Sequence, residues 1–308
     1  MTTTLAPVAI FAYRRPAHLR ATLETLMDCE GFGDSPIVIH CDGPADEQQR
    51  DAVEATKAVA RQMLGEKAEY RFSETNLGLS KSIIAGVSNV VERYGRVIVV
   101  EDDLAVAPGF LAYMNKALDR YAGADTVYQV SGYQYQVSEF KNRQSALFLP
   151  LTVSWGWGTW KRAWDQLDPL ATGWEALKDD KATRRRFNFG GAYDYARMLE
   201  RQMNGQSDSW AIRWYWTVFR NHGKVLFPPH SLVRNNGFDG SGTHGRGFLR
   251  NFNPHQLQPA ASQIQFPENV NTNDEDYQSV RRAMIRANGG PLVRAVGRLG
   301  RLLGSGRT

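Results

Sequence analysis

Short apolar runs alternate with segments of helical periodicity through the first hundred residues, and this alternation is the feature that most constrains the fold. Four runs have the length and composition of strands: 7–13, 36–43, 68–74 and 96–100. The segments between them place apolar residues every three or four positions, which is typical of helices that cover a sheet. Strands separated by helices of this size predict a parallel α/β sheet.

Polar side chains stand at the ends of three of these predicted strands. Tyr13, Arg14 and Arg15 follow the first, Asp42 and Gly43 the second, and Glu101, Asp102 and Asp103 the fourth. In open α/β sheets, ligands bind beyond the carboxyl ends of the strands, so these residues are expected to converge on one crevice. Three adjacent carboxylates repel one another. We therefore expect a positive group beside them, either a basic side chain or a metal ion.

Several kinds of site end a strand in acidic residues. A P-loop requires a glycine before its lysine, and the nearest segment, GLSKS at 78–82, lacks it. A receiver domain would carry its acids after the first and third strands rather than together after the fourth. The remaining interpretation is a nucleotide-sugar site, in which a divalent ion held by a strand-end aspartate bridges two phosphates.

The second half of the chain is richer in aromatic residues and less regular. Six of the eight tryptophans lie between Trp155 and Trp210. We expect strands within 126–135, 147–160 and 225–233, and helices within 174–204 and 207–223. A glycine-rich loop at 235–247 and an irregular polar stretch at 250–275 precede a basic C-terminal segment.

Five short motifs, in this order, carry a resemblance to a known family: AIFAYRRPAHL, HCDGP, NLGLSKSI, VVEDDL and SWGWGTWKRAW. Over residues 7–245 the chain resembles the GT-A fold glycosyltransferases, in particular the inverting N-acetylglucosaminyltransferase I type and bacterial family-2-like sugar transferases. The resemblance implies an α/β fold with a mostly parallel central sheet flanked by helices and a smaller acceptor-side region. It implies a catalytic domain at 1–248, made of a nucleotide-sugar-binding half (1–124) and an acceptor-binding half (125–248), before a C-terminal extension (249–308).

The resemblance also implies roles for the acidic triplet and its basic neighbours. Asp103 would bind the metal ion, Mn²⁺ or Mg²⁺, while Glu101 and Asp102 would contact the ribose, the sugar or adjacent groups. The alternative is a solvated acidic turn. Arg14 or Arg15 would help to hold the nucleotide or its diphosphate, unless both are solvated residues at a helix start.

The remaining donor-site residues come from the first two strand ends and a loop. Asp42 would accept hydrogen bonds from the uracil or ribose edge, or simply form an Asp-Gly turn. Asn76 and Gly78 resemble the family's loop that lines the donor pocket, where glycine permits close backbone approach. Tyr13 is assigned to the same site, and Lys81 would reach a phosphate or face solvent.

Inverting sugar transfer needs a base that deprotonates the acceptor hydroxyl as it attacks the anomeric carbon. The best candidate is Asp208, because the resembling enzymes carry an acidic residue before a tryptophan at a helix start in this region. Ser209 stands where the N-acetylglucosaminyltransferase I type has a second aspartate, which leaves the register open by one residue. Asp208 could instead cap the helix. Asp165 and Asp168 are fallback candidates.

Trp155, Trp157 and Trp160 are predicted to bind the acceptor, because flat aromatic faces stack on sugar C–H surfaces and exclude water. Gly156 and Gly158 between them would let the backbone approach a bound sugar. The alternative is a packed aromatic core.

The glycine-rich loop at 235–247 offers a further possible metal ligand. Many GT-A enzymes use a late histidine for this purpose, and neutral imidazole suits Mn²⁺. His244 is the candidate here, with Asp239 as its replacement. The loop would otherwise act as a lid that orders when the donor binds.

These features predict a metal-dependent, inverting glycosyltransferase that moves a sugar from a UDP-sugar to a hydroxyl of a surface glycan or lipid-linked oligosaccharide. A nucleotidyltransferase acting on sugar phosphates and an inactive glycan-binding module are the alternatives. The mild net charge of +5 does not predict nucleic-acid binding. Two cysteines, no convincing signal peptide and no apolar run of roughly 18 residues indicate a cytoplasmic protein. The tail at 292–303 interleaves arginine with leucine and valine, which favours either peripheral contact with an anionic membrane or a disordered tail.

Overall fold

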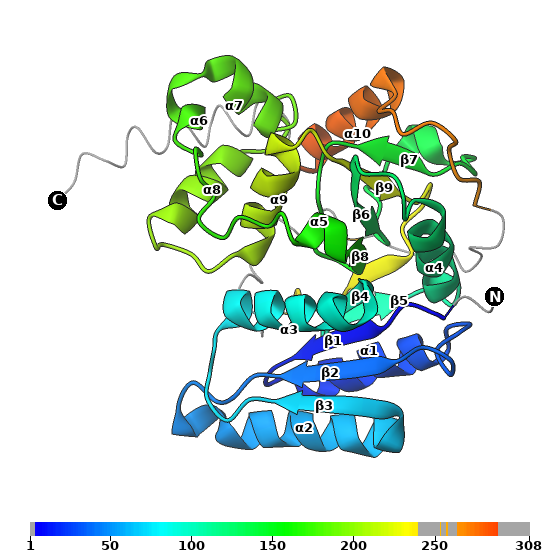
Figure 1. Ribbon diagram of the computed structural model, residues 1–308, viewed down its shortest axis with the longest axis vertical. Helices are drawn as coiled ribbons and strands as arrows, with labels where there is room; N and C mark the ends of the chain where they lie inside the picture. The colour runs from blue at the N-terminus through cyan, green and yellow to red at the C-terminus, as the bar shows by residue number, and fades with distance from the viewer. Residues whose placement is uncertain (1–3, 240–252, 254–256, 258–263, 289–308) are drawn as a thin grey trace.

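A single eight-stranded sheet runs through the computed structural model, which describes residues 4–239, 253, 257 and 264–288 (Figure 1). Its strand order is β3-β2-β1-β4-β8-β6-β9-β7. In chain order the strands are β1 (Val8–Ala12), β2 (Ile37–Cys41), β3 (Ala68–Phe72), β4 (Arg96–Glu101), β6 (Val127–Ser131), β7 (Leu147–Leu149), β8 (Trp157–Trp160) and β9 (Lys224–Phe227).

The first half of the chain forms the parallel part of this sheet. Strands β3, β2, β1 and β4 are parallel neighbours. They are connected by three long helices, α1 (Pro16–Met27), α2 (Arg50–Leu64) and α3 (Leu79–Tyr94). Strands β8 and β7 run antiparallel to their neighbours, while β6 and β9 keep the direction of β4. The predicted mostly parallel α/β sheet flanked by helices is confirmed.

Helices cover both faces of the sheet, so its strands bury alternate side chains in two separate cores (Figure 1). In β1, Ala9 and Phe11 belong to one core, whereas Val8 and Ile10 belong to the other. The first core also contains residues of α3, α5 (Lys161–Trp164) and α9 (Trp210–Arg220). The second core contains residues of α1, α2 and α4 (Phe110–Arg120).

The second half departs from its predicted elements. The strand-like segment 147–160 forms two strands, β7 and β8, which lie at different positions in the sheet. The predicted helical stretch 174–204 consists of α6 (Ala176–Asp179), α7 (Lys181–Phe187) and α8 (Tyr195–Met203). After β9 the chain turns into β10 (Val233–Asn235), which pairs antiparallel with β5 (Leu104–Val106) beside the acidic triplet. Short 3-10 helices complete the list: η1 (Glu47–Gln49), η2 (Gly65–Lys67) and η3 (Ser138–Phe140).

A helix near the C-terminus, α10 (Asp274–Ala287), was not anticipated from the sequence. Asn273 caps it by accepting the amides of Glu275 and Asp276. Its inner side buries Val280 and Met284 in the same core as α9, so the described part of the predicted extension packs on the predicted catalytic domain. The boundary at 248 stays a prediction.

Within the described residues, no helix is long and apolar enough to cross a membrane. The predicted basic amphipathic tail falls at 292–303, outside the described part of the chain.

Candidate active site

The acidic triplet lies where β4 ends and the chain turns into β5. Arg15 is the residue before α1, and its guanidinium lies between two carboxylates of the triplet, those of Asp102 and Asp103. Its Nη2 donates to Asp102 Oδ1 at 2.9 Å and to Asp103 Oδ2 at 2.8 Å. Of the two positive groups predicted beside the acids, the structure shows the basic side chain, and it is Arg15 rather than Arg14.

One arginine does not neutralise three carboxyl groups in a buried setting. Burial, followed by the charges of Asp103 and Asp102, raises the pKa of Glu101 to about 8. Burial also raises the pKa of Asp102 to about 6, although Arg15 opposes the shift. The excess of negative charge means that these residues fit a second cation.

The described residues contain no group of three or more His, Cys, Asp or Glu side chains placed to hold a metal ion by themselves. A cation at Asp103 would therefore take its other ligands from water or from a bound diphosphate, as Mg²⁺ commonly does. The donor set suits such a shared site rather than a closed protein cage.

The segment after β10 covers the acids. Asn236 donates its amide to the carbonyl of Asp103 at 2.7 Å. Gly237 lies so close that a Cβ there would collide with Asp103 Oδ2, which explains the glycine. Asp239, the alternative metal ligand, pairs with His18 of α1 at 3.1 Å. His244 falls outside the described residues, so its predicted role as a ligand stays a prediction.

Asp42 holds the loop that precedes α3. Its Oδ1 accepts the amides of Gly43 and Leu77 at 3.0 and 2.9 Å, and its Oδ2 accepts the amide of Gly78 at 3.0 Å. Asn76 Nδ2 donates to the carbonyl of Gly43 at 2.8 Å. Asp42 is therefore more than an Asp-Gly turn, because it fixes the predicted donor loop, and its contact with a nucleotide stays a prediction.

The other predicted donor-site residues surround this arrangement. The hydroxyl of Tyr13 donates to Gln49 Oε1 at 2.7 Å, and its amide donates to Asp102 Oδ2 at 3.2 Å. Arg14 is exposed, with its guanidinium 5.9 Å from the centre of the Tyr13 ring. Lys81 is exposed in the first turn of α3.

Asp208 lies against the same loop from the other side. Its Oδ2 accepts the amide of Ser80 at 3.1 Å, and a Cβ on Gly78 would lie 3.2 Å from this oxygen. The N-cap residue of α9 is Ser209, and no side chain caps that helix. Asp208 thus contacts the start of α3, and the alternative that it caps α9 is wrong.

The fallback bases have local structural partners. Asp165 pairs with Lys161 at 2.7 Å on α5. Asp168 accepts the amides of Leu170 and Thr172 at 3.0 and 2.7 Å, which closes a turn.

The structure corrects the acceptor prediction for two of the three tryptophans. Trp157 is 0% exposed and stacks on Trp210 with 5.0 Å between ring centres. Trp160 is 4% exposed and donates its Nε1–H to the carbonyl of Leu118 at 2.9 Å. Both rings belong to β8, whose two faces are covered, so neither presents a face to a sugar. Gly158 serves this packing too, since a Cβ there would lie 2.9 Å from the carbonyl oxygen of Val97 on β4.

Trp155 remains a candidate for acceptor binding. Val99 of β4 pairs with Trp157 of β8 in antiparallel register, so Trp155 precedes β8 at the edge where Glu101 ends β4. Its ring is half-buried and meets Phe238 edge-on at 5.7 Å. Trp155 therefore lies at the same edge of the sheet as the acidic triplet.

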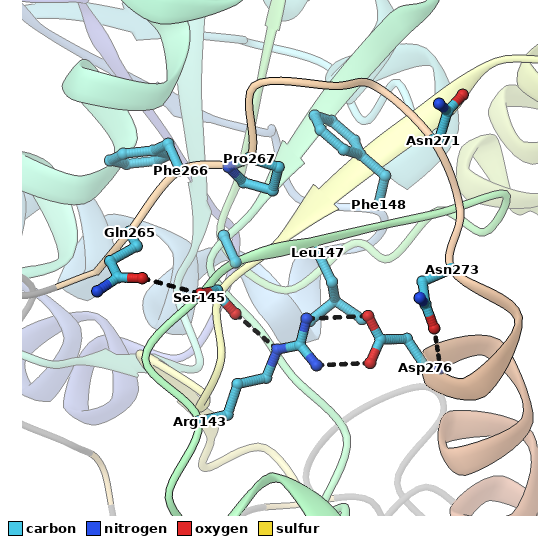
Figure 2. A pocket seen from close by; sticks show the side chains of 11 residues that line it. Arg143, Ser145, Leu147, Phe148, Gln265, Phe266, Pro267, Asn271, Asn273 and Asp276 are labelled. Carbon is cyan, nitrogen blue, oxygen red and sulfur yellow. Dashed lines mark hydrogen bonds and ion pairs between the residues drawn. The ribbon is translucent and has the colours of Figure 1, made fainter.

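A cavity of about 330 Å³ lies between β7 and the segment leading into α10 (Figure 2). Arg143 and Asp276 form an ion pair across it, with nitrogen–oxygen distances of 2.5 and 2.9 Å. None of the predicted site residues lines this cavity. The candidate site is the cluster of polar side chains at the carboxyl ends of β1, β2 and β4.

A mostly parallel α/β sheet with acidic and basic side chains at the carboxyl ends of its strands is typical of glycosyltransferases of the GT-A class. The family model for glycosyl transferase family 2 matches residues 8–202. The chain belongs to glycosyl transferase family 2. The match covers β1 to α8 and ends six residues before Asp208.

Solved structures with a similar chain course include two transferases. A crystal structure of GalNAc-T7 with UDP, GalNAc and Mn²⁺ aligns at a TM-score of 0.47 and 11% identity. That alignment covers 75% of this chain and 44% of the other, so this chain spans less than half of its length. The mannosyltransferase PcManGT from Pyrobaculum calidifontis, in complex with GDP-Man and Mn²⁺, aligns at 0.39 and 12% identity, covering 71% and 70%. A search of curated proteins found no match.

Proposed function

We propose that this glycosyltransferase is metal-dependent and inverting, and that it transfers a sugar from a UDP-sugar to a hydroxyl of a surface glycan or lipid-linked oligosaccharide. The observation that carries the proposal is the contact chain from the acidic turn to Asp208. Asp102 accepts the amide of Tyr13, Asp42 follows the adjacent strand and holds the amide of Gly78, and Asp208 lies against Gly78. These contacts support one site in which a cationic diphosphate complex would lie near a carboxylate that would act as base.

The donor side is built to hold a leaving diphosphate. A divalent cation, Mn²⁺ or Mg²⁺, held by Asp103 would neutralise the charge that develops on the departing nucleoside diphosphate. Arg15 adds a positive charge whose position is set by Asp102 and Asp103. Arg14 and Lys81 are exposed at the same edge, where their side chains can reach phosphate oxygens.

On the acceptor side, Asp208 is the proposed base. Its side chain is 56% exposed, so a hydroxyl can reach it. In a single displacement, the acceptor oxygen forms a bond to the anomeric carbon while the bond from that carbon to the diphosphate oxygen breaks. The hydroxyl proton passes to Asp208, and the electron pair leaves with the diphosphate. This path inverts the anomeric configuration and requires no covalent enzyme intermediate.

The first test is a thermal shift with UDP and with GDP, each with and without Mn²⁺, on the wild type and on Asp103→Ala. Stabilisation by UDP only when Mn²⁺ is present, and its loss in the variant, is the expected result. A larger shift with GDP would correct the donor base. No shift with any pair of nucleotide and metal would reject the proposed donor site.

A screen of UDP-sugars for release of UDP then tests the reaction itself. Release of UDP indicates glycosyl transfer or donor hydrolysis, whereas a nucleotidyltransferase would release no UDP from these donors and would release pyrophosphate only from UTP and a sugar phosphate. The expected effect of Asp208→Asn is loss of transfer with an unchanged UDP-dependent thermal shift. Proton NMR of the fresh product gives the anomeric configuration, and retention would contradict the proposed single displacement.

A membrane-facing acceptor is the least constrained part of the proposal, and it depends on the tail at 292–303. Co-sedimentation with vesicles rich in anionic lipid, compared with neutral vesicles, tests it on the full chain and on a chain ending at Asn288. Equal binding of the two chains would remove the tail from the proposal.

A further inference from the structure

Arg213 is a partly buried cation beside the proposed base, and the sequence analysis did not identify it. It lies in the first turn of α9, and its side chain is only 15% exposed. Its Nη2 is 3.8 Å from Asp208 Oδ1. Burial lowers the pKa of Arg213, and the nearby Asp208 opposes that shift.

Three oxygen acceptors from separate segments hold the Arg213 guanidinium in place. Nε donates to the carbonyl of Ser209 at 3.3 Å, and Nη1 donates to the carbonyl of Pro169 at 3.4 Å. Nη2 donates to the hydroxyl of Ser80, at the start of α3. Since none of these acceptors belongs to Asp208, the position of the guanidinium does not depend on the carboxylate beside it.

Ser80 joins the two helix starts through both of its polar groups. Its hydroxyl accepts from Arg213 on α9, while its amide donates to Asp208 Oδ2 at 3.1 Å. The side chain is buried, at 1% exposure. Consequently Oδ2 of Asp208 is fixed by α3, whereas Oδ1 faces a positive charge that is too distant for a direct hydrogen bond.

We propose that Arg213 is the positioning residue for the acceptor base: it joins the starts of α3 and α9 and thereby holds Asp208 with Oδ1 free to receive the acceptor proton. The inference rests on the proposed function of Asp208. If the carboxylate of Asp208 were displaced by about 1 Å, the rate of transfer would fall on the order of 10²-fold, because the acceptor hydroxyl must lie at hydrogen-bonding distance from it during the attack.

The same helix provides a matched control. Arg220 lies at the other end of α9, and its Nη1 is also 3.8 Å from a carboxylate, that of Asp168. Its side chain is 48% exposed, and among the described residues it contacts Asp168, the carbonyl of Thr172 and the ring of Trp216. An arginine removed from each end of the helix therefore separates loss of an ion pair from loss of the base position.

The experiment compares Arg213→Gln, Arg213→Lys and Arg220→Gln with the wild type, on the full chain with the UDP-sugar identified by the screen. It measures kcat and KM for donor and acceptor, the ratio of transfer to donor hydrolysis, and the thermal shift with UDP and Mn²⁺. For Arg213→Gln we expect kcat to fall about 10- to 100-fold, with donor KM and thermal shift unchanged and a lower transfer-to-hydrolysis ratio. Arg213→Lys keeps the charge but cannot donate to three separated acceptors, so it should recover only part of kcat. Arg220→Gln should match the wild type.

Two results would overturn the inference while leaving the proposed function intact. One is a kcat for Arg213→Gln within twofold of the wild type while Asp208→Asn is inactive. The other is a loss in Arg213→Gln that appears equally in donor KM and UDP binding, which would make Arg213 a donor-site residue. If Arg213→Gln does not fold, Arg213→Lys decides by the same two criteria. A wild type that binds UDP yet shows no transfer with any acceptor would reject the proposed function and the inference together.

Discussion

The acidic turn after β4 and the tryptophans of β8 are neighbours in the sheet, yet their environments are opposite. In the turn, one guanidinium pairs with two of the three carboxyl groups, and the pKa of Glu101 is raised to about 8 because burial and its acidic neighbours disfavour its charge. In β8, the rings of Trp157 and Trp160 are buried in the two cores on either side of the sheet. One region keeps unbalanced charge that a ligand can neutralise, while the other is complete without a ligand.

The difference comes from position along a strand. Glu101 is the last residue of β4, and the following two residues lie beyond that strand, where their carboxylates bind Arg15. Trp157 and Trp160 begin and end β8, but both are held within the sheet: Trp157 pairs with Val99 and Ser131, and Trp160 pairs with Arg96 at the opposite end of β4 from the acids. Only Trp155, before β8, reaches the edge. A residue type typical of sugar binding is informative only where the strand has ended.

The largest expected effect is on the buried side of this comparison. Trp157→Ala should lower the free energy of unfolding by about 3–5 kcal/mol, because it opens a cavity beneath Trp210 and Trp164. Urea unfolding followed by circular dichroism measures it. Trp157→Phe is the matched variant. It keeps an aromatic ring and removes a buried Nε1–H that has no hydrogen-bond partner among the described residues, so its cost should be much smaller.

The contrast between a packed β8 and a ligand-binding turn would be wrong if Trp157→Ala were as stable as the wild type and had a lower affinity for the acceptor. That outcome would mean that the ring becomes exposed when substrate binds. Trp155→Ala is expected to behave in the reverse way, with a small change in stability and a raised acceptor KM.

The second effect tests the charged side. Asp103→Asn should reduce kcat/KM about 10²- to 10³-fold, because the leaving diphosphate loses its electrostatic partner. Stability should stay level or rise, since the change removes one negative charge from a cluster with an excess of them. Asp125→Asn, at an exposed position, is the control. A loss of stability equal to that of Trp157→Ala would make Asp103 a structural residue.

Much of the fold follows from local patterns in the first hundred residues. Strands β1 to β4 match their predicted segments to within two residues at each end, and helices α1 to α3 lie in the segments between them, because each apolar run is long enough to be interpreted alone. The second half could not be read this way, since β7 and β8 are three and four residues long and pair with strands distant in sequence. Helix α10 did have a local signal, in Asn273 followed by three acids, which is typical of a helix start.

The site residues differ in the same way: local sequence patterns could place some of them, whereas others depend on contacts between distant segments. Strand ends in a parallel sheet meet at one edge by geometry, so the acids and Asp42 could be placed near each other from the sequence. Arg14 and Arg15 could not be distinguished, because only the turn into α1 decides which of them faces the acids. Arg213 could not be found either, since its contact with Ser80 joins residues 133 positions apart.

A third, smaller effect on stability is expected for Asp42. This residue is buried like the tryptophans of β8 and carries a carboxylate like the acidic turn. Asp42→Asn replaces one acceptor oxygen with an NH₂ group that opposes the amide of Gly78 or of Leu77. The expected cost is about 1–3 kcal/mol in unfolding free energy, and the loosened loop should also weaken the UDP-dependent thermal shift. A weakened shift with unchanged stability of the nucleotide-free protein would instead indicate that Asp42 contacts the nucleotide directly.

The smallest expected effect is a pH dependence of stability that comes from His40. This residue lies on β2, the strand that leads to Asp42, and like Trp157 it packs within the protein. The imidazole of His40 on β2 stacks on Phe11 with 4.7 Å between ring centres, and within the described part of the chain its Nε2 has no hydrogen-bond partner. Burial, with help from Arg71, lowers the pKa of His40 from 6.5 to about 4. Below pH 6.5, His40 is protonated in the unfolded chain but stays neutral in the folded protein. The free energy of unfolding therefore falls as the pH drops from 6.5 towards 4.

Because His40 is only partly buried, the loss should be about 1–2 kcal/mol, below the ~3 kcal/mol that the full shift would give. The measurement is the difference in unfolding free energy between the wild type and His40→Phe at several pH values. This difference isolates His40 from the other titrating groups. His222→Asn is the control, because His222 is exposed and Asn tolerates its positive φ of 52°. A difference that stays flat between pH 6.5 and 4 would mean that water reaches the His40 ring, and that this part of the sheet is less closely packed than the tryptophan core across β4.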